Sequence, residues 1–135
     1  MSKKLAGIFG VVFVLVGVLG FFSNPIVGAV GYFETDLVHN LVHLLIGVVL
    51  LLVVATAPGK SNLWLKIVGA LYLVLALFGF LSITDSGTLF GLVRMNNADN
   101  YLHLLLGVII FGAGFMSSDE HEMPQSMPMS GAGMM

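Results

Sequence analysis

Apolar residues gather in four long stretches of the chain, at about 5–22, 37–56, 63–83 and 100–116. Each stretch is close to the roughly 20 residues that an α-helix needs to cross the hydrocarbon core of a bilayer. Backbone groups in that core must be hydrogen-bonded within a helix or a closed barrel, and the alternating pattern of barrel strands is absent. The pattern therefore predicts four transmembrane helices and an all-α fold.

Composition supports a membrane location. Of the 135 residues, 58% are hydrophobic and only 9% are charged, too few to cover the surface of a soluble domain. The first stretch is longer than the apolar region of a typical signal peptide, and the following "GFFSNP" does not resemble a cleavage site, so we expect a retained helix. The lipid bilayer is thus the expected partner, and the net charge of −2 suggests no nucleic-acid partner.

The distribution of basic residues predicts the orientation. Only Arg94 lies in the loops at 23–36 and 84–99, whereas four lysines flank the N-terminus and the turn at 57–62 (Lys3, Lys4, Lys60 and Lys66). Basic residues favour the cytoplasmic side. We therefore expect a multi-pass protein of the bacterial inner (plasma) membrane with both termini in the cytoplasm. The loops at 23–36 and 84–99 are expected at the outer face, without strands.

Two parts of the chain share one phrase. "GYFETDLVHNLVHLLIGVV" (31–49) and "GLVRMNNADNYLHLLLGVI" (91–109) match Asn40 with Asn100 and His43 with His103. The first helices of the two halves align more weakly, at an offset of 62 that pairs Gly17 with Gly79. Two passes per copy give both copies the same orientation, so this is a parallel repeat. It predicts a bundle of four transmembrane helices made of two duplicated hairpins, with repeats at about 4–56 and 63–116 in one membrane domain, 1–116.

Polar residues of the shared phrase are the candidate site. Asn40, His43 and Gly47 are spaced as one stripe of a helix, and Asn100, His103 and Gly107 repeat that stripe. Exposing a polar group to lipid costs free energy, so these side chains should point into the bundle and form hydrogen bonds there. We expect each histidine to bond an asparagine or a loop carbonyl and so hold the outer loops to the helices. The glycines of the pattern should allow close helix packing: Gly17, Gly47, Gly79 and Gly107.

Two other interpretations of the histidines stay open. In the first, His43 and His103 ligate a haem b iron or another metal across the bundle. In the second, they form a titrating relay with His39, Asp36 and Asp99, as in a small transporter or proton-relay protein. The absence of an acidic residue deep in any predicted helix speaks against the relay. No cofactor is expected in the structural interpretation.

The composition changes abruptly at residue 117. The segment 117–135 is rich in Ser, Gly, Pro and Met and has no apolar periodicity, which predicts a disordered cytoplasmic tail. Its thioethers and imidazole are soft ligands that suit copper, so a copper site is the alternative (His121, Met123, Met127 and Met129). Irregular spacing and a cytoplasmic position favour the disordered tail.

The sequence resembles a known family. The phrase N-x-x-H-L-L-x-G at 40–47 and 100–107, "MNNADNYLHLLLGV" (95–108) and "GVLGFF" (17–22) are similar to the bacterial four-helix membrane family called domain of unknown function number 4383. The resemblance covers about 4–116 and implies a small multi-pass membrane protein, with no activity, substrate or cofactor attached. We therefore expect a non-enzymatic structural or accessory membrane module that acts in a membrane complex or by self-association.

Overall fold

The computed structural model describes residues 1–82 and 87–116, and this part of the chain is mostly helical. Its four α-helices are α1 (Ser2–Leu19), α2 (Leu37–Thr56), α3 (Ser61–Ser82) and α4 (Asn97–Ala113). A short 3₁₀ turn, η1 (Pro58–Lys60), joins α2 to α3. The predicted tail at 117–135 lies outside the described residues.

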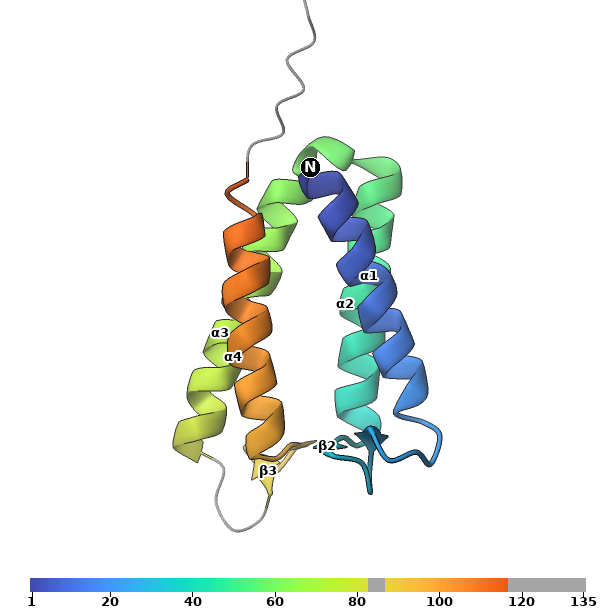
Figure 1. Ribbon diagram of the computed structural model, residues 1–135, viewed down its shortest axis with the longest axis vertical. Helices are drawn as coiled ribbons and strands as arrows, with labels where there is room; N and C mark the ends of the chain where they lie inside the picture. The colour runs from blue at the N-terminus through green and yellow to red at the C-terminus, as the bar shows by residue number, and fades with distance from the viewer. Residues whose placement is uncertain (83–86, 117–135) are drawn as a thin grey trace, which may run out of the picture.

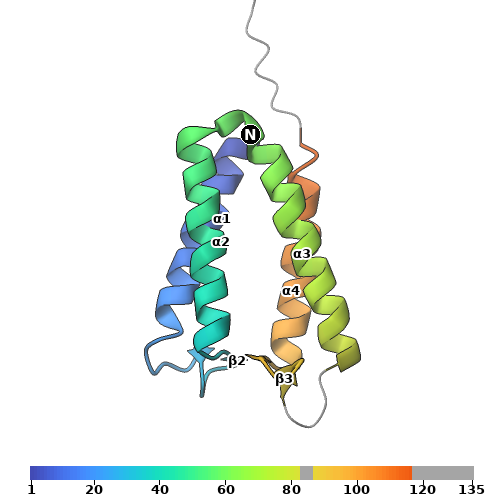
Figure 2. The same ribbon diagram turned by 180° about the vertical axis from the view of Figure 1, so that it is seen from behind.

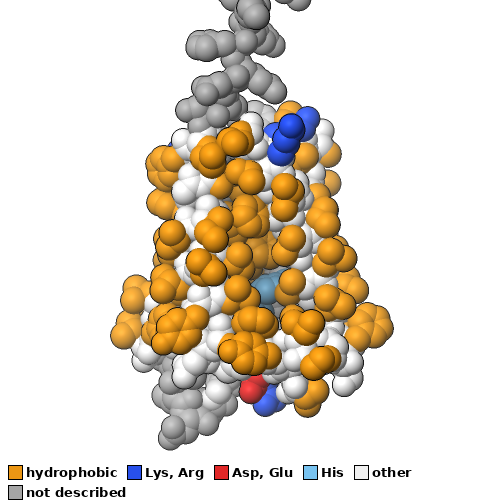
Figure 3. Space-filling model, viewed as in Figure 1, with side chains coloured by type: hydrophobic (Ala, Val, Ile, Leu, Met, Phe, Trp, Pro, Cys, Tyr) orange, Lys and Arg blue, Asp and Glu red, His pale blue; other side chains and the backbone are white. Residues whose placement is uncertain are grey.

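Three helices of the described chain, α1, α2 and α3, are long and apolar enough to cross a membrane. The fourth, α4, has 17 residues and is therefore about 26 Å long, slightly less than the thickness of the hydrocarbon core. Exposed apolar side chains cover the outer faces of all four helices (Figure 3). A helix that is apolar on its exposed face as well as its buried face is typical of a lipid-facing protein.

The helices pack as two hairpins, α1 against α2 and α3 against α4 (Figures 1 and 2). The N-terminus, η1 and the last turn of α4 lie at one end of the molecule, and the short strands lie at the other. Lys3, Lys4 and Lys60 are therefore at one end, and Arg94 is at the opposite end. The structure thus separates the basic residues in the way that the sequence pattern predicts for opposite faces of a membrane.

Glycines lie where the paired helices approach each other. A Cβ added at Gly17 of α1 would lie 2.9 Å from the carbonyl oxygen of Asn40 on α2. One added at Gly47 of α2 would lie 2.8 Å from the carbonyl oxygen of Gly10 on α1. Small residues allow such backbone contact between helices in membranes. The other two candidate glycines lie in the second hairpin: Gly79 against the side chain of Asn100, and Gly107 against Leu73.

The outer loops contain short strands that the sequence analysis did not predict. In the first loop, β1 (Val27–Gly28) pairs in parallel with β2 (Phe33–Glu34). In the second, β3 (Thr88–Leu89) pairs antiparallel with β4 (Val93–Arg94). Each strand has two residues, too few to leave a period-two pattern in the sequence. We call this end of the molecule, residues 27–36 and 87–96, the strand layer.

Candidate functional site

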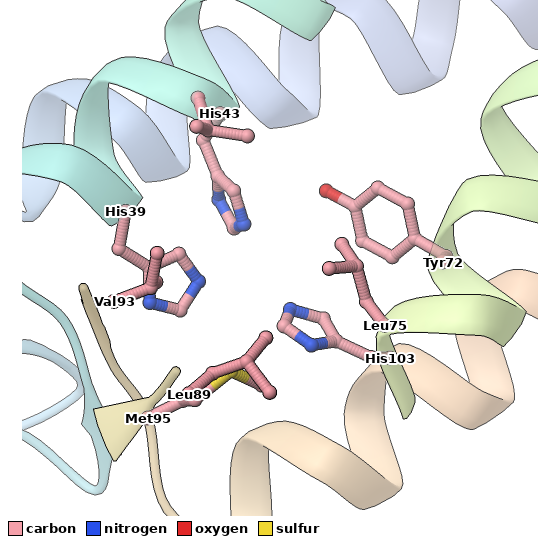
Figure 4. Close-up of a pocket in the computed structure, with 9 residues that line it drawn as sticks. His39, His43, Tyr72, Leu75, Leu89, Val93, Met95 and His103 are labelled. Atoms are coloured by element: carbon pink, nitrogen blue, oxygen red, sulfur yellow. The ribbon is translucent and has the colours of Figure 1, made fainter. Parts of the chain in front are cut away.

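Three of the chain's four histidines meet between the hairpins. His39 and His43 lie one turn apart on α2, and His103 projects from α4 (Figure 4). Each offers one ring nitrogen, and these three atoms all lie within 4.8 Å of one another. The exposed fractions of the three side chains are only 4%, 8% and 4%. We call His39, His43 and His103 the histidine cluster.

Aromatic rings from the other two helices complete its surroundings. Tyr72 of α3 meets His103 edge to face, with ring centroids 5.1 Å apart. Phe13 of α1 stacks on Tyr72 at 5.2 Å and lies 5.9 Å from His43. Both side chains are almost completely buried. Every helix therefore contributes a ring to the centre of the bundle, where the two hairpins touch.

A backbone carbonyl fixes the orientation of His39. Its Nδ1 lies 2.9 Å from the carbonyl oxygen of Arg94, in β4 of the other hairpin. A carbonyl oxygen can only accept a hydrogen bond, so Nδ1 carries the proton and donates it. The Nε2 atom of a neutral ring then keeps its lone pair. Figure 4 shows the three imidazole rings arranged around a common space.

Two polar atoms beside this space are buried without a hydrogen-bond partner among the described residues. They are Nδ1 of His103 and the hydroxyl of Tyr72. Buried polar groups in native structures are usually hydrogen-bonded, and each exception calls for an explanation such as an ion or a water molecule. The unpaired groups therefore mark this space as a candidate binding site.

Two cavities border the histidine cluster, and all three histidines line both of them. One cavity, of about 80 Å³, lies towards α2 and α3 and is also lined by Tyr72 and Met95. The other, of about 160 Å³, is also lined by Val16 of α1 and by Asp99 and Leu102 of α4. Figure 3 shows a histidine side chain in the opening on the face where α1 and α4 lie. The histidines thus separate two small spaces.

The strand layer beneath the cluster joins the two hairpins by hydrogen bonds. The backbone N–H of Arg94 donates to the Asp36 carboxylate, at 2.9 Å, and the N–H of Glu34 donates to Asp99, at 3.1 Å. The Arg94 guanidinium also pairs with Glu34, at 2.8 Å. The side-chain amide of Asn96 donates to the carbonyl oxygen of Tyr32. Counting Asp99 at the start of α4, three carboxylates and one guanidinium lie at this end of the bundle, next to the histidines.

The two predicted asparagines lie elsewhere. The Asn100 carboxamide is fully buried against Gly79, and neither its nitrogen nor its oxygen has a hydrogen-bond partner in the described chain. The Asn40 carboxamide lies against Gly20. Hydrogen bonds between the two loops come from residues of the strand layer. The predicted ligands of the tail, His121, Met123, Met127 and Met129, lie outside the described residues.

Sequence reasoning assigned His39 only to the relay and did not single out Tyr72 or Met95. One available signal was the spacing of His39 and His43, four residues apart on one helix face. Another was the position of Tyr72 among apolar residues in the middle of the third stretch, where a hydroxyl group needs a partner. The proximity of Met95 depends on the path of the second loop, which no periodic pattern describes.

Comparison with known proteins places the chain in a family. The profile of the family described as "Domain of unknown function (DUF4383)" matches residues 3–116. The chain belongs to this family. The DUF4383 match includes the histidine cluster and the whole strand layer, and it ends where the predicted tail begins. No curated protein and no solved structure matches the chain.

Proposed function

We propose that the protein is a four-pass membrane module made of two duplicated hairpins, with both termini in the cytoplasm. Its role is structural or accessory and non-enzymatic. Lipid covers its outer faces, and a membrane complex or a second copy of the chain is its protein partner. Support comes from three features: matched contacts in the two hairpins, the apolar face of α4, and the bonds across the strand layer.

Equivalent contacts in the two hairpins support the duplication. Gly20 lies against the Asn40 side chain in the first hairpin, as Gly79 lies against Asn100 in the second. Asn40 and Asn100 occupy matching positions in the two repeats, so the glycines that contact them, Gly20 and Gly79, should match as well. This pairs each residue of α1 with the residue 59 positions later in α3. The same offset pairs Phe13 with Tyr72, which stack at the centre. The contacts therefore favour 59 over the offset of 62 that the weaker sequence alignment suggests.

The surface of α4 supports a fourth crossing. Its exposed residues include Leu105, Val108 and Ile109, with about half or more of each side chain accessible. The helix packs against α3, which is long enough to cross the membrane. The end of α4 lies at the same end of the molecule as the start of α1 (Figure 1). A span of about 26 Å is accommodated by modest thinning of the bilayer.

The hydrogen bonds of the strand layer carry the proposed role. They run from one hairpin to the other. Several of them use backbone groups of Glu34 and Arg94, which do not depend on the side chain at those positions. Bonds of this kind hold two hairpins in one relative position, which suits a module that presents a fixed apolar surface to a neighbouring membrane protein. The carboxylates of Asp36 and Asp99 are both used in these bonds.

Cysteine labelling tests this topology, because the chain contains no cysteine of its own. Single cysteines would be placed at three exposed sites: Val30 in the first outer loop, Gly59 in η1 and Met116 after α4. We expect a membrane-impermeant maleimide to label Val30→Cys in intact spheroplasts. It should label Gly59→Cys and Met116→Cys only after permeabilisation. A buried control, Leu50→Cys, should react only in denaturant.

Two outcomes would contradict the proposal. Labelling of Met116→Cys from outside would show that α4 does not cross the membrane. Labelling of Gly59→Cys from outside, with Val30→Cys protected, would reverse the orientation.

A further inference from the structure

We propose that His39, His43 and His103 bind one divalent transition-metal ion of the Zn²⁺ class at the centre of the bundle. The strongest observation is geometric: two helices of different hairpins bring three imidazole nitrogens within 4.8 Å of one another in a buried place. Imidazole is a good ligand for zinc, copper, iron and nickel. Three histidines around an open fourth position form a known type of zinc site.

The distances are close to those of a bound ion. Zinc–nitrogen bonds of about 2.0–2.1 Å in a tetrahedral site place the ligand nitrogens about 3.3 Å apart. The cluster, at up to 4.8 Å, needs inward ring movements of roughly 1 Å to reach this separation. The adjoining cavities of about 80 and 160 Å³ leave room for that movement. An ion therefore requires rotation of the rings and no rearrangement of the helices.

The surroundings of His39 are those of a metal ligand. A ligating histidine usually donates its second ring N–H to a carbonyl or carboxylate, which fixes the tautomer. The Arg94 carbonyl oxygen, 2.9 Å from Nδ1 of His39, is in that position and leaves Nε2 free to ligate. On the other hairpin, Nδ1 of His103 is buried without a hydrogen-bond partner among the described residues, so no protein group there competes with an ion for the lone pairs of this ring.

The same geometry favours a bare ion over haem. Two axial histidines need a flat macrocycle between them, but the ring of His39 lies 4.8 Å from His43 and 5.6 Å from His103. Tyr72 closes another side, 5.1 Å from His103. Sites for organic ligands usually measure about 300–1,000 Å³. The two cavities are far smaller, whereas an ion with one water molecule needs little space.

Charge and access also agree with a cation. The Asp99 carboxylate lines the cavity of about 160 Å³ together with the three histidines. That cavity also borders the strand layer through Phe33 and Thr35, at the end of the molecule that we assign to the outer face. In this low-dielectric interior, a nearby negative charge favours a bound cation strongly.

Binding of Co²⁺ to the full chain in detergent tests the inference, because four-coordinate Co²⁺ absorbs visible light and reports its ligands. We expect one Co²⁺ per chain, displaced by one equivalent of Zn²⁺. His103→Gln should abolish the visible band. His121→Gln, which changes the fourth histidine in the tail, is the matched control and should leave the band unchanged.

Folding is checked in every sample by circular dichroism and gel filtration. If His103→Gln does not fold, His39→Gln and His43→Gln replace it. Folded wild-type protein that binds neither Co²⁺ nor Zn²⁺ stoichiometrically would overturn the inference without any variant. Binding that is lost in His121→Gln and kept in His103→Gln would move the site to the tail and also overturn it. Either result would leave the cysteine-labelling pattern, and hence the proposed membrane module, untouched.

Discussion

Replacement of Gly47 by alanine tests the close packing of α1 on α2. The added Cβ would lie 2.7 Å from the backbone nitrogen of Val14 and 2.8 Å from the carbonyl oxygen of Gly10. Ordinary contacts begin at 3.4 Å, so the two helices must separate locally by roughly 0.7 Å. Backbone atoms cannot rotate away as a side chain can. Overpacking of this kind destabilises proteins by about 1–3 kcal/mol.

The matched control is Gly7→Ala on α1, where an added Cβ meets nothing within 4 Å. Both changes gain about 1 kcal/mol of helix propensity, which cancels when the two variants are compared. We expect the free energy of unfolding of Gly47→Ala to be about 1–3 kcal/mol below that of Gly7→Ala. The assay is unfolding by SDS in mixed micelles, followed by circular dichroism. Equal stability of the two variants would refute the packing argument.

Two further substitutions separate side-chain from backbone contributions in the strand layer, with the same unfolding assay. Asn96→Ala removes the cap of α4 and the bond to Tyr32, and we expect a loss of about 1–2 kcal/mol; an unchanged stability would contradict the capping role. Arg94→Ala removes only the half-exposed ion pair with Glu34 and keeps the backbone bonds of residue 94, so we expect a loss below about 1 kcal/mol. A larger loss for Arg94→Ala than for Asn96→Ala would reverse the assignment.

Sequence patterns predicted the helices better than their ends. The second helix was predicted at 37–56 and is Leu37–Thr56 in the structure. The fourth was predicted to begin at residue 100, but α4 begins at Asn97 because Asn96 and Asp99 form a capping box. The Asn96 and Asp99 spacing of this capping box can be recognised in the sequence. The prediction was based on the apolar residues alone and therefore assigned the polar first turn of α4 to the loop.

The candidate site was predicted only in part, for a physical reason. The spacing of His43 within its helix identifies a buried face, and the repeated phrase adds His103. The spacing of four residues places His39 on the same helix face as His43, but the orientation of its ring depends on how the second loop passes the first hairpin, because the Arg94 carbonyl holds that ring in place. Contacts between segments 55 residues apart leave no periodic trace in one sequence. The contacts of Gly20 with Asn40 and of Gly79 with Asn100, which favour an offset of 59 between α1 and α3, also join segments far apart in the sequence. They could therefore be recognised only in the structure.

X-ray absorption at the zinc edge would test most directly the claim that the hairpins converge on one metal site. The sample is the full-length protein in detergent, loaded with one equivalent of Zn²⁺. A site made of His39, His43 and His103 should give scattering from three imidazole rings with zinc–nitrogen distances of about 2.0–2.1 Å. A spectrum with fewer than three imidazoles, or with sulfur neighbours from the methionine-rich tail, would contradict it.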